Sequence, residues 1–300
     1  MRSFIVNNRR SVFMLPQTFL LKLHLCPGIG QVGELRIAEY LRQRPTAQLD
    51  VTQLCQLARL NARQTQHLQQ AWLSPQLAMA VRQHQQINTL TWLDAAYPEY
   101  LRESYRPPAV LFYQGDLNLL QQPVLALVGA RQATNYTQRV LSQFMPALVA
   151  NQVVTISGLA AGADRMAHLT TLAAHGSTIA VIGTGLDVYY PRVNQALQQR
   201  IATTGLVLTE YPLGSSPQRH HFPERNRILA GLCQALCVTE ARHHSGSLIT
   251  ANLALQANRN VLAVPGALWQ PLSVGCNQLI AAGARPALSA TDLLEELAII

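Results

Sequence analysis

Residues 235–251 decide the fold, and they read Ala-Leu-Cys-Val-Thr-Glu-Ala-Arg-His-His-Ser-Gly-Ser-Leu-Ile-Thr-Ala. The apolar run 235–239 is typical of a buried strand, and residues 247–257 are predicted to form a helix. The small residues Ser245, Gly246 and Ser247 leave backbone amides and two hydroxyls uncovered where that helix begins. Uncovered amides and the helix dipole both favour an anion at this place. The stretch therefore predicts a strand, an anion-binding turn and a helix.

A basic segment precedes this strand. Residues 222–227 read Phe-Pro-Glu-Arg-Asn-Arg, and they supply two arginines and an asparagine one strand away from the turn. Guanidinium groups suit planar phosphate contacts. We expect Arg225, Asn226 and Arg227 to complete a phosphate cradle with the turn, and we interpret the cradle as a nucleic-acid site.

Outward from this stretch, apolar strands alternate with helices. The expected strands are 124–128, 153–156, 178–182, 205–208, 235–239 and 261–264. The expected helices are 137–150, 163–174, 192–202, 247–257 and 273–282. Strands this apolar, most of them followed by a helix, indicate an α/β fold with a mostly parallel, Rossmann-like sheet covered on both faces. Weaker strand patterns at 88–93 and 107–113 indicate extra edge strands.

The loops after these strands are rich in glycine and arginine. Ligands of such sheets bind outside the carboxyl ends of the strands, so the loops are expected to converge on one site. Besides the turn and the cradle, the candidate site residues are Gly129, Arg131, Gly183, Gly185, Arg192, Asn194 and Thr250. The dinucleotide fingerprint and the P-loop pattern are both absent, which disfavours nicotinamide and ATP chemistry. No cofactor is expected.

The first part of the chain has a different character. Residues 15–82 show a helical pattern and are predicted to form a small all-α domain, after an arm at 1–14 and before a large domain at 83–300. Residues 1–82 carry 10 basic and 3 acidic groups, within a net charge of +8 for all 300 residues. This excess fits an acidic polymer as partner. The Pro-Gly-Ile-Gly turn at 27–30 resembles a helix-hairpin-helix turn, although an ordinary tight turn would read the same.

The composition limits the cellular compartment and the kinds of chemistry that the protein can perform. The five cysteines form no Cys-x-x-Cys pair, which is typical of reduced thiols in a cytoplasmic protein. No apolar run reaches the roughly 18 residues that a membrane helix needs, so no membrane segment is expected. Asp164 and His168 lie four residues apart and could form an acid–base pair, but a helix-start aspartate and a packed histidine are the preferred interpretation. The paired histidines at 220–221 and 243–244 lack ligand-spaced partners, so no metal is expected.

Ordered motifs over residues 90–300 resemble the DprA family, also called Smf, of DNA-processing proteins. The motifs are Val128–Arg131, Ser157–Asp164 with His168, Gly183–Asp187 with Tyr190-Pro191, Glu210–Pro212, Phe222–Gly231, Ser245–Ala251, and Pro265-Gly266 with Gly275–Asn277. The resemblance implies a Rossmann-like domain after a small SAM-like helical domain. It also implies single-stranded DNA binding, a homodimer, loading of the RecA recombinase in natural transformation, and no catalysis. It places the DNA pocket on the candidate residues named above, with Ala130 replacing a usual serine and Ala163 a usual isoleucine.

Three alternatives remain at this point. Bases of a bound strand need stacking partners, and the candidates are Tyr136, Tyr189, Tyr190, Tyr211 and Phe222, although core packing explains Tyr211 and Phe222 equally well. A related fold includes phosphoribohydrolases that process nucleotides, but residues 245–250 lack the glutamate of their catalytic loop. A scaffold that binds only the recombinase would need no arginine cradle.

Overall fold

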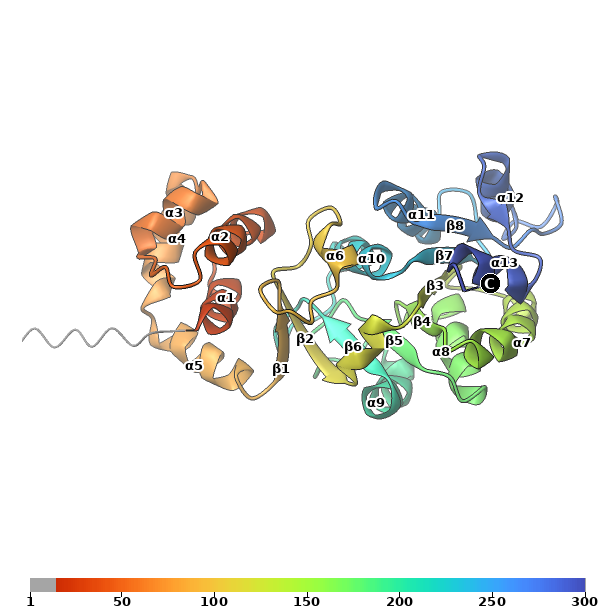
Figure 1. The fold of residues 1–300 in the computed structure, drawn as a ribbon, viewed down its shortest axis with the longest axis horizontal. Helices are drawn as coiled ribbons and strands as arrows, with labels where there is room; N and C mark the ends of the chain where they lie inside the picture. The colour runs from red at the N-terminus through yellow and green to blue at the C-terminus, as the bar shows by residue number, and fades with distance from the viewer. Residues whose placement is uncertain (1–14, 300) are drawn as a thin grey trace, which may run out of the picture. The chain divides into compact units, whose positions relative to one another are not determined.

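The computed structural model describes residues 15–299, and the chain divides into two units between Val81 and Arg82 (Figure 1). The arm predicted at residues 1–14 lies outside the described residues. Within 15–299 no helix is both long and apolar enough to cross a membrane.

The first unit is helical, as its apolar periodicity predicts. Capping boxes begin two of its helices: Asp50 with Gln53, and Asn61 with Gln64, each bond at 2.8–3.0 Å. Its core is made of leucine and isoleucine side chains that are fully or almost fully buried. Its helices are α1 (Pro16–Leu25), α2 (Gln31–Gln43), α3 (Val51–Ala58), α4 (Ala62–Trp72) and α5 (Pro75–His84), which runs across the division. The Pro-Gly-Ile-Gly turn connects α1 to α2, and its contact with DNA stays a prediction.

The second unit is built on one sheet, which has nine strands in the described residues, in the order β1-β2-β6-β5-β4-β3-β7-β8-β9. Strand β2 pairs antiparallel with both of its neighbours, β1 and β6, and all other neighbouring strands pair parallel. The strands are β1 (Asn88–Thr91), β2 (Val110–Gly115), β3 (Val124–Val128), β4 (Val154–Ser157), β5 (Thr178–Val181), β6 (Leu206–Thr209), β7 (Ala235–Val238), β8 (Asn260–Ala263) and β9 (Arg285–Pro286). The predicted α/β fold with a mostly parallel sheet is confirmed.

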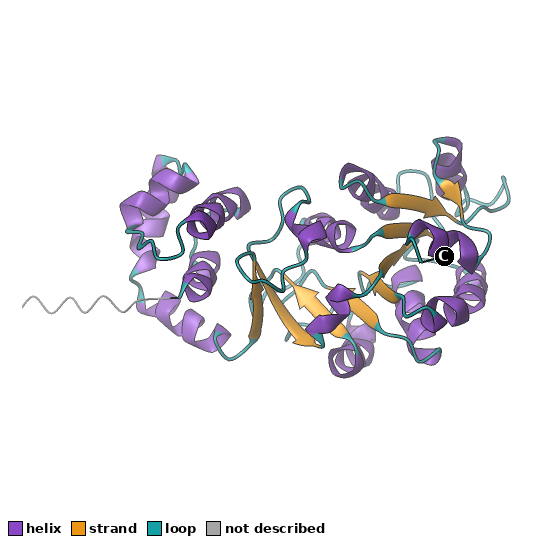
Figure 2. Ribbon diagram, viewed as in Figure 1, coloured by secondary structure: helices purple, strands orange, loops and turns teal. Residues whose placement is uncertain are grey.

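Helices cover both faces of this sheet (Figure 2). On one face pack α6 (Glu99–Arg102), α10 (His221–Leu232), α11 (Gly246–Gln256) and α12 (Val274–Ala281), and on the other α7 (Asn135–Ala150), α8 (Ala163–Ala173) and α13 (Ala290–Glu296). The remaining helices are α9 (Gln195–Thr204) and the 3-10 helices η1 (Leu117–Gln121) and η2 (Arg192–Asn194).

Burial on both faces explains the apolar strands. Successive residues of β3 point to opposite cores: Val124, Ala126 and Val128 join the α10–α11 side, while Leu125 and Leu127 join the α7–α8 side. A strand buried in this way has no polar face, so its sequence reads as a continuous apolar run. Each of the six predicted strands lies within one residue of its expected ends.

The strand order reverses at β3. From β3 the chain adds β4, β5 and β6 on one side, and it then returns to add β7 and β8 on the other. The loops that leave β3 and β7 therefore run in opposite directions and open a crevice at the carboxyl ends of the two strands. Ligands of open α/β sheets bind at this kind of switch point.

Candidate nucleic-acid interface

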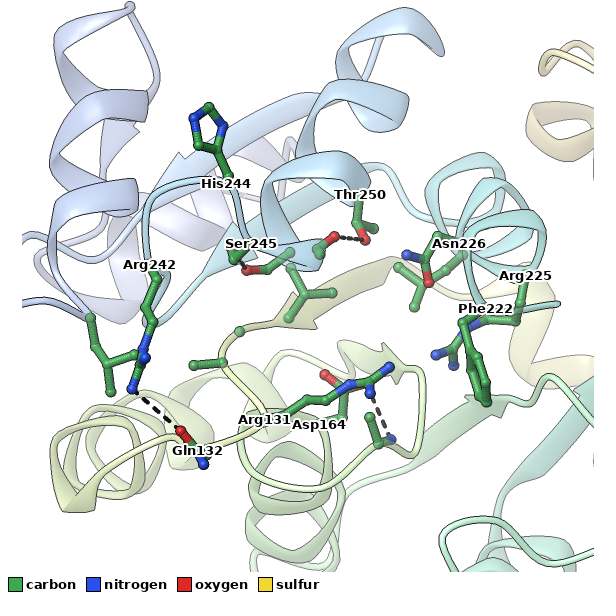
Figure 3. A pocket seen from close by; sticks show the side chains of 18 of the residues that line it. Arg131, Gln132, Asp164, Phe222, Arg225, Asn226, Arg242, His244, Ser245 and Thr250 are labelled. Atoms are coloured by element: carbon green, nitrogen blue, oxygen red, sulfur yellow. Dashed lines mark hydrogen bonds between the residues drawn. The ribbon is translucent and has the colours of Figure 1, made fainter. Parts of the chain in front are cut away.

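A pocket of about 560 Å³ occupies this crevice (Figure 3). It is lined by the loops that follow β3 and β7, by residues between β4 and the start of α8, by the start of α11 and by one side of α10. Eight of the residues predicted to bind DNA lie in its wall: Gly129, Arg131, Arg225, Asn226, Ser245, Gly246, Ser247 and Thr250. The structure thus brings together segments that are more than a hundred residues apart in the sequence.

The start of α11 presents hydrogen-bond donors to the pocket. Ser245 is its N-cap residue, but its side chain makes no capping bond and meets the Ser247 hydroxyl at 2.8 Å instead. The first amides of a helix have no partner within it, so this turn offers amides together with hydroxyls. A Cβ added at Gly246 would meet nothing within 4 Å, which means that a ligand can approach the backbone there. This geometry suits a phosphate.

Positive charge stands at the rim on two exposed arginines. Arg131 follows β3, and its guanidinium lies 5.6 Å from the centre of the Phe222 ring. Arg242 follows β7 and donates to the Gln132 side chain at 3.3 Å, which connects the two loops. The Tyr190 ring lies 5.4 Å from the Phe222 ring. The rim thus combines cations with aromatic faces.

Arg225 forms part of the floor instead. It is 5% exposed and donates to the carbonyl of Val181, at the end of β5. A Cβ at Gly158 would lie about 2 Å from its guanidinium, so glycine is needed for this approach. Burial raises the pKa of Asp164 on the pocket wall, and the charge of Arg225 offsets part of that shift. Arg225 therefore orders the floor, while its neighbour Asn226 lines the wall.

Arg227 does not line the pocket. It is 8% exposed and forms a buried ion pair with Glu210, in which Nη2 lies 2.6 and 2.7 Å from the two carboxylate oxygens. The structure does not bring Arg227 into the predicted cradle, because residues 222–227 belong to helix α10 and its side chain pairs with Glu210. The helical turn sends Arg225 and Arg227 to different partners.

Four other predicted residues lie outside the pocket wall. Asn194 is buried, and its amide donates to the carbonyls of Leu159 and Ala160 at 2.9 and 3.3 Å, so it orders the loop after β4. Gly183 is buried behind Phe222 and its carbonyl accepts from His221. Gly185 is also buried, whereas Arg192 is exposed in η2.

Several lining residues were not predicted as DNA contacts. Gln132, Arg242, His243 and His244 all face the pocket. Their positions directly after β3 and β7 are the signal that could have found them, because loops at these carboxyl ends form the site. The sequence pattern of His243 and His244 raises only the possibility of a metal site, and no metal is expected there. Within 15–299 no group of three or more His, Cys, Asp or Glu side chains is placed to hold a metal.

Asp164 and His168 have separate partners. The Asp164 carboxylate accepts from the amide of Ala160 at 3.3 Å, near the start of α8. His168 is fully buried, its Nδ1 lies 2.7 Å from the Thr178 hydroxyl, and burial lowers its pKa to about 3. A neutral, enclosed imidazole is a packing group. The aromatic candidate Tyr211 is also structural, since it stacks on His221 at 3.8 Å and donates to Glu224.

The fold and the pocket define a class: Rossmann-like α/β proteins with a pocket at the switch point of the sheet, lined here by groups that suit a phosphate. Residues 88–298 match the model of the DNA recombination-mediator protein A family. The chain belongs to this family, as its motifs predict.

Named relatives and solved structures agree with this assignment. DNA processing protein DprA of Streptococcus pneumoniae is 45% identical over 215 residues, 72% of this chain and 76% of that protein. The relative from Bacillus subtilis is 41% identical over 220 residues, 73% of this chain and 74% of that protein. The X-ray structure of the Streptococcus pneumoniae protein superposes with a TM-score of 0.88 at 38% identity, covering 93% of this chain and 97% of that one. DNA processing protein A of Helicobacter pylori, whose structure addresses its single-stranded DNA binding mode, gives a TM-score of 0.63 at 28% identity over 71% and 96% of the two chains.

Proposed function

We propose that this protein binds single-stranded DNA in the switch-point pocket and acts as a recombination mediator without catalysing a reaction. One observation carries the proposal: the uncovered amides of the Ser245–Ser247 turn and the exposed Arg131 face the same pocket, from loops after different strands. Amides at a helix start and guanidinium groups are both phosphate ligands. The single-stranded DNA binding of the Helicobacter pylori relative supports the same conclusion.

The rim indicates how a strand would lie. Phosphates would contact the turn and Arg131, while bases would meet the exposed ring of Tyr190 and the half-buried ring of Phe222 beside it. Neither kind of contact reads base identity, because every base has a stacking face and every nucleotide a phosphate. We therefore expect binding that tolerates sequence and weakens with salt.

The proposal extends to partners on the strength of the family. We propose that the protein acts in the cytoplasm as a homodimer and loads the RecA recombinase onto strands taken up in natural transformation. Loading places recombinase on a strand that the mediator already holds, so a defect in the pocket should abolish loading together with binding.

The test is a titration of the full chain with fluorescent oligothymidylate and with a duplex of matched length, each at low and at moderate salt. We expect tight binding to the single strand, weak binding to the duplex, and affinity that falls as salt rises. Equal affinity for the two, or no binding at low salt, would reject the proposal. RecA filament formation on the same strand, coated first with single-stranded DNA-binding protein, then measures loading.

Nucleotide processing is the competing function, but the carboxylates near the pocket are engaged within the chain. Asp164 on the pocket wall accepts from the Ala160 amide at 3.3 Å. Glu240 accepts from the Thr134 amide at 2.7 Å and from the Thr134 and Thr137 hydroxyls at 2.8 Å, so it holds the start of α7. We expect no turnover of nucleoside monophosphates, and hydrolysis by the full chain that is lost in an Arg131 variant would favour the enzyme.

A further inference from the structure

A second cavity of about 480 Å³ adjoins the pocket. It lies between the start of α7, Glu240 in the loop after β7, and the loop 266–273. Its lining residues are Thr134, Tyr136, Glu240, Gly266, Ala267, Gln270, Leu272 and Ser273. Leu272 lines both this side cavity and the main pocket, so the two are neighbours along the same rim.

Specific hydrogen bonds fix the walls of the side cavity. The Asn277 side chain accepts from the Gly266 amide at 3.2 Å and donates to its carbonyl at 2.9 Å. The Leu272 carbonyl accepts from the Ala241 amide at 2.7 Å. The Tyr136 hydroxyl donates to the Pro265 carbonyl at 2.6 Å, which ties helix α7 to the loop. A cavity held by contacts from three elements is preformed.

The lining specifies the chemistry of an occupant. Thr134, Gln270 and Ser273 are polar, and Glu240 brings a carboxylate, so neither an apolar segment nor a second phosphate fits. Glu240 uses three acceptor positions within the chain, and a carboxylate has about four. One N–H donor can therefore be accepted. The Tyr136 ring, 41% exposed, adds an aromatic wall. A flat heterocycle with N–H donors at its edge matches this combination.

We propose that the side cavity takes one base of the bound strand, stacked on Tyr136, while the backbone continues from the main pocket across Leu272. This inference rests on the proposed single-stranded DNA binding and assigns a base subsite to it. All four bases carry an N–H donor at the edge that pairs in a duplex, so the subsite accepts any of them but excludes a paired base. It would thus select single strands over duplexes.

The loop that borders the cavity is exposed, so a ligand can reach the cavity past it. Trp269 and Leu268 are each 81% exposed on this loop. A protein partner could cover these two side chains, and this alternative is an outcome of the test below. The polar lining of the cavity beside them favours a base.

The test compares Tyr136→Ala with Tyr136→Phe, which keeps the ring and loses only the hydroxyl. Each variant is titrated with oligothymidylate and with an abasic strand of the same length. A stacked base contributes a roughly tenfold gain in affinity. We expect Tyr136→Ala to bind the intact strand about tenfold more weakly. Tyr136→Phe keeps the ring and loses only the bond to Pro265, so it should lose less affinity than Tyr136→Ala. The parent chain and Tyr136→Ala should bind the abasic strand alike.

Three results would overturn the inference. Tyr136→Ala could bind the intact strand like the parent, or it could lose as much affinity for the abasic strand, which would indicate a structural effect on the backbone site. It could also keep DNA binding and lose only self-association or RecA binding, which would identify the loop as a protein interface. The parent chain itself reports on the proposed function: if it binds no strand, that proposal fails, whereas normal parent binding with an unchanged variant rejects only the base subsite.

Discussion

The rim and the floor of the pocket are both built with arginine, and the two regions use it in opposite ways. At the rim, Arg131 and Arg242 are exposed and extend from loops after β3 and β7. At the floor, Arg225 is 5% exposed, and Arg227 of the same helix, outside the pocket wall, is 8% exposed and paired with Glu210. A charge that is already desolvated and paired has little left to give to a ligand. The comparison teaches that the charge left available to a ligand lies on the loops, while the arginines of α10 are engaged within the fold.

The largest expected effect is at the buried ion pair. Replacing Arg227→Met leaves the Glu210 carboxylate buried without its counter-charge, and breaking such a pair costs about 3–5 kcal/mol. We expect the free energy of unfolding, measured by urea titration, to fall by that amount. At temperatures where the variant is folded, its DNA affinity should match that of the parent chain.

The control is the double variant Arg227→Met with Glu210→Leu, which removes both charges. It should recover a large part of the lost stability, because apolar pairs often replace buried ion pairs without loss. If Arg227→Met were as stable as the parent but bound DNA weakly, Arg227 would belong to the rim and the comparison would fail.

The next effect is at the rim and should spare stability. Arg131→Ala removes an exposed guanidinium, so we expect the free energy of unfolding to stay within about 0.5 kcal/mol. The free energy of binding to oligothymidylate should become less favourable by about 1.5–3 kcal/mol, the range for a hydrogen bond to a charged group. The slope of log affinity against log salt should fall by about 0.7 for the lost phosphate contact.

Arg139→Ala is the matched control, because Arg139 is exposed on α7 and does not line the pocket. It should leave affinity almost unchanged. Equal losses from the two variants would mean that net charge alone drives binding and that the pocket is not the site.

The difference between rim and floor also marks what the sequence could predict. The positions of the turn Ser245–Ser247 and of Arg131 were predictable, because each follows a short apolar run that is typical of a buried strand in a parallel sheet. The partner of Arg227 was not predictable, since nothing in residues 222–227 shows that Glu210 at the end of another strand would face it. The same reason applies to Asn194, whose buried amide bonds to the loop after β4.

For the loops after β3 and β7, the sequence predicted the position at the site but not the side-chain contacts between them. Gln132 follows β3 and Arg242 follows β7, but their mutual hydrogen bond depends on the strand order, which places these two strands side by side. The antiparallel edge of β1 and β2 was predicted as extra strands, without direction. Fold class follows from local pattern, whereas side-chain partners across the sheet require the topology.

A smaller effect concerns pH and arises at His168, which is buried outside the pocket wall. The pKa of His168 is lowered by burial to about 3 in the folded chain, against about 6.5 when unfolded. Between these values the unfolded chain binds the extra proton, so stability is fully present above pH 6.5 and is lost as pH falls. We expect a loss of about 1.4 kcal/mol in the free energy of unfolding between pH 7.5 and 5.5.

The variant His168→Gln removes this titration. At pH 7.5 it should be less stable than the parent, because it loses the imidazole bond to the Thr178 hydroxyl. Its free energy of unfolding should nevertheless change less between the two pH values. An unchanged slope in the variant would show that other groups cause the acid sensitivity. DNA binding at constant folded fraction should not depend on this residue, in contrast to the rim.

The smallest effect tests whether the rim can be improved. Ala130 lines the pocket between Gly129 and Arg131, and its carbonyl accepts from the amides of Ala133 and Ala163, each at 3.1 Å, so its backbone is fixed. Ala130→Ser adds a hydroxyl donor and no charge. We expect affinity for oligothymidylate to rise by about 0.5–1 kcal/mol, the net value of one neutral hydrogen bond, with an unchanged salt slope. Ala133→Ser, in the same loop but outside the wall, should change nothing.

Because the rim is made of exposed donors, its contributions should add, so Ala130→Ser should give the same gain in an Arg131→Ala background. A gain that vanished there would mean that the hydroxyl acts only by positioning Arg131, and the rim would then be a coupled network like the floor.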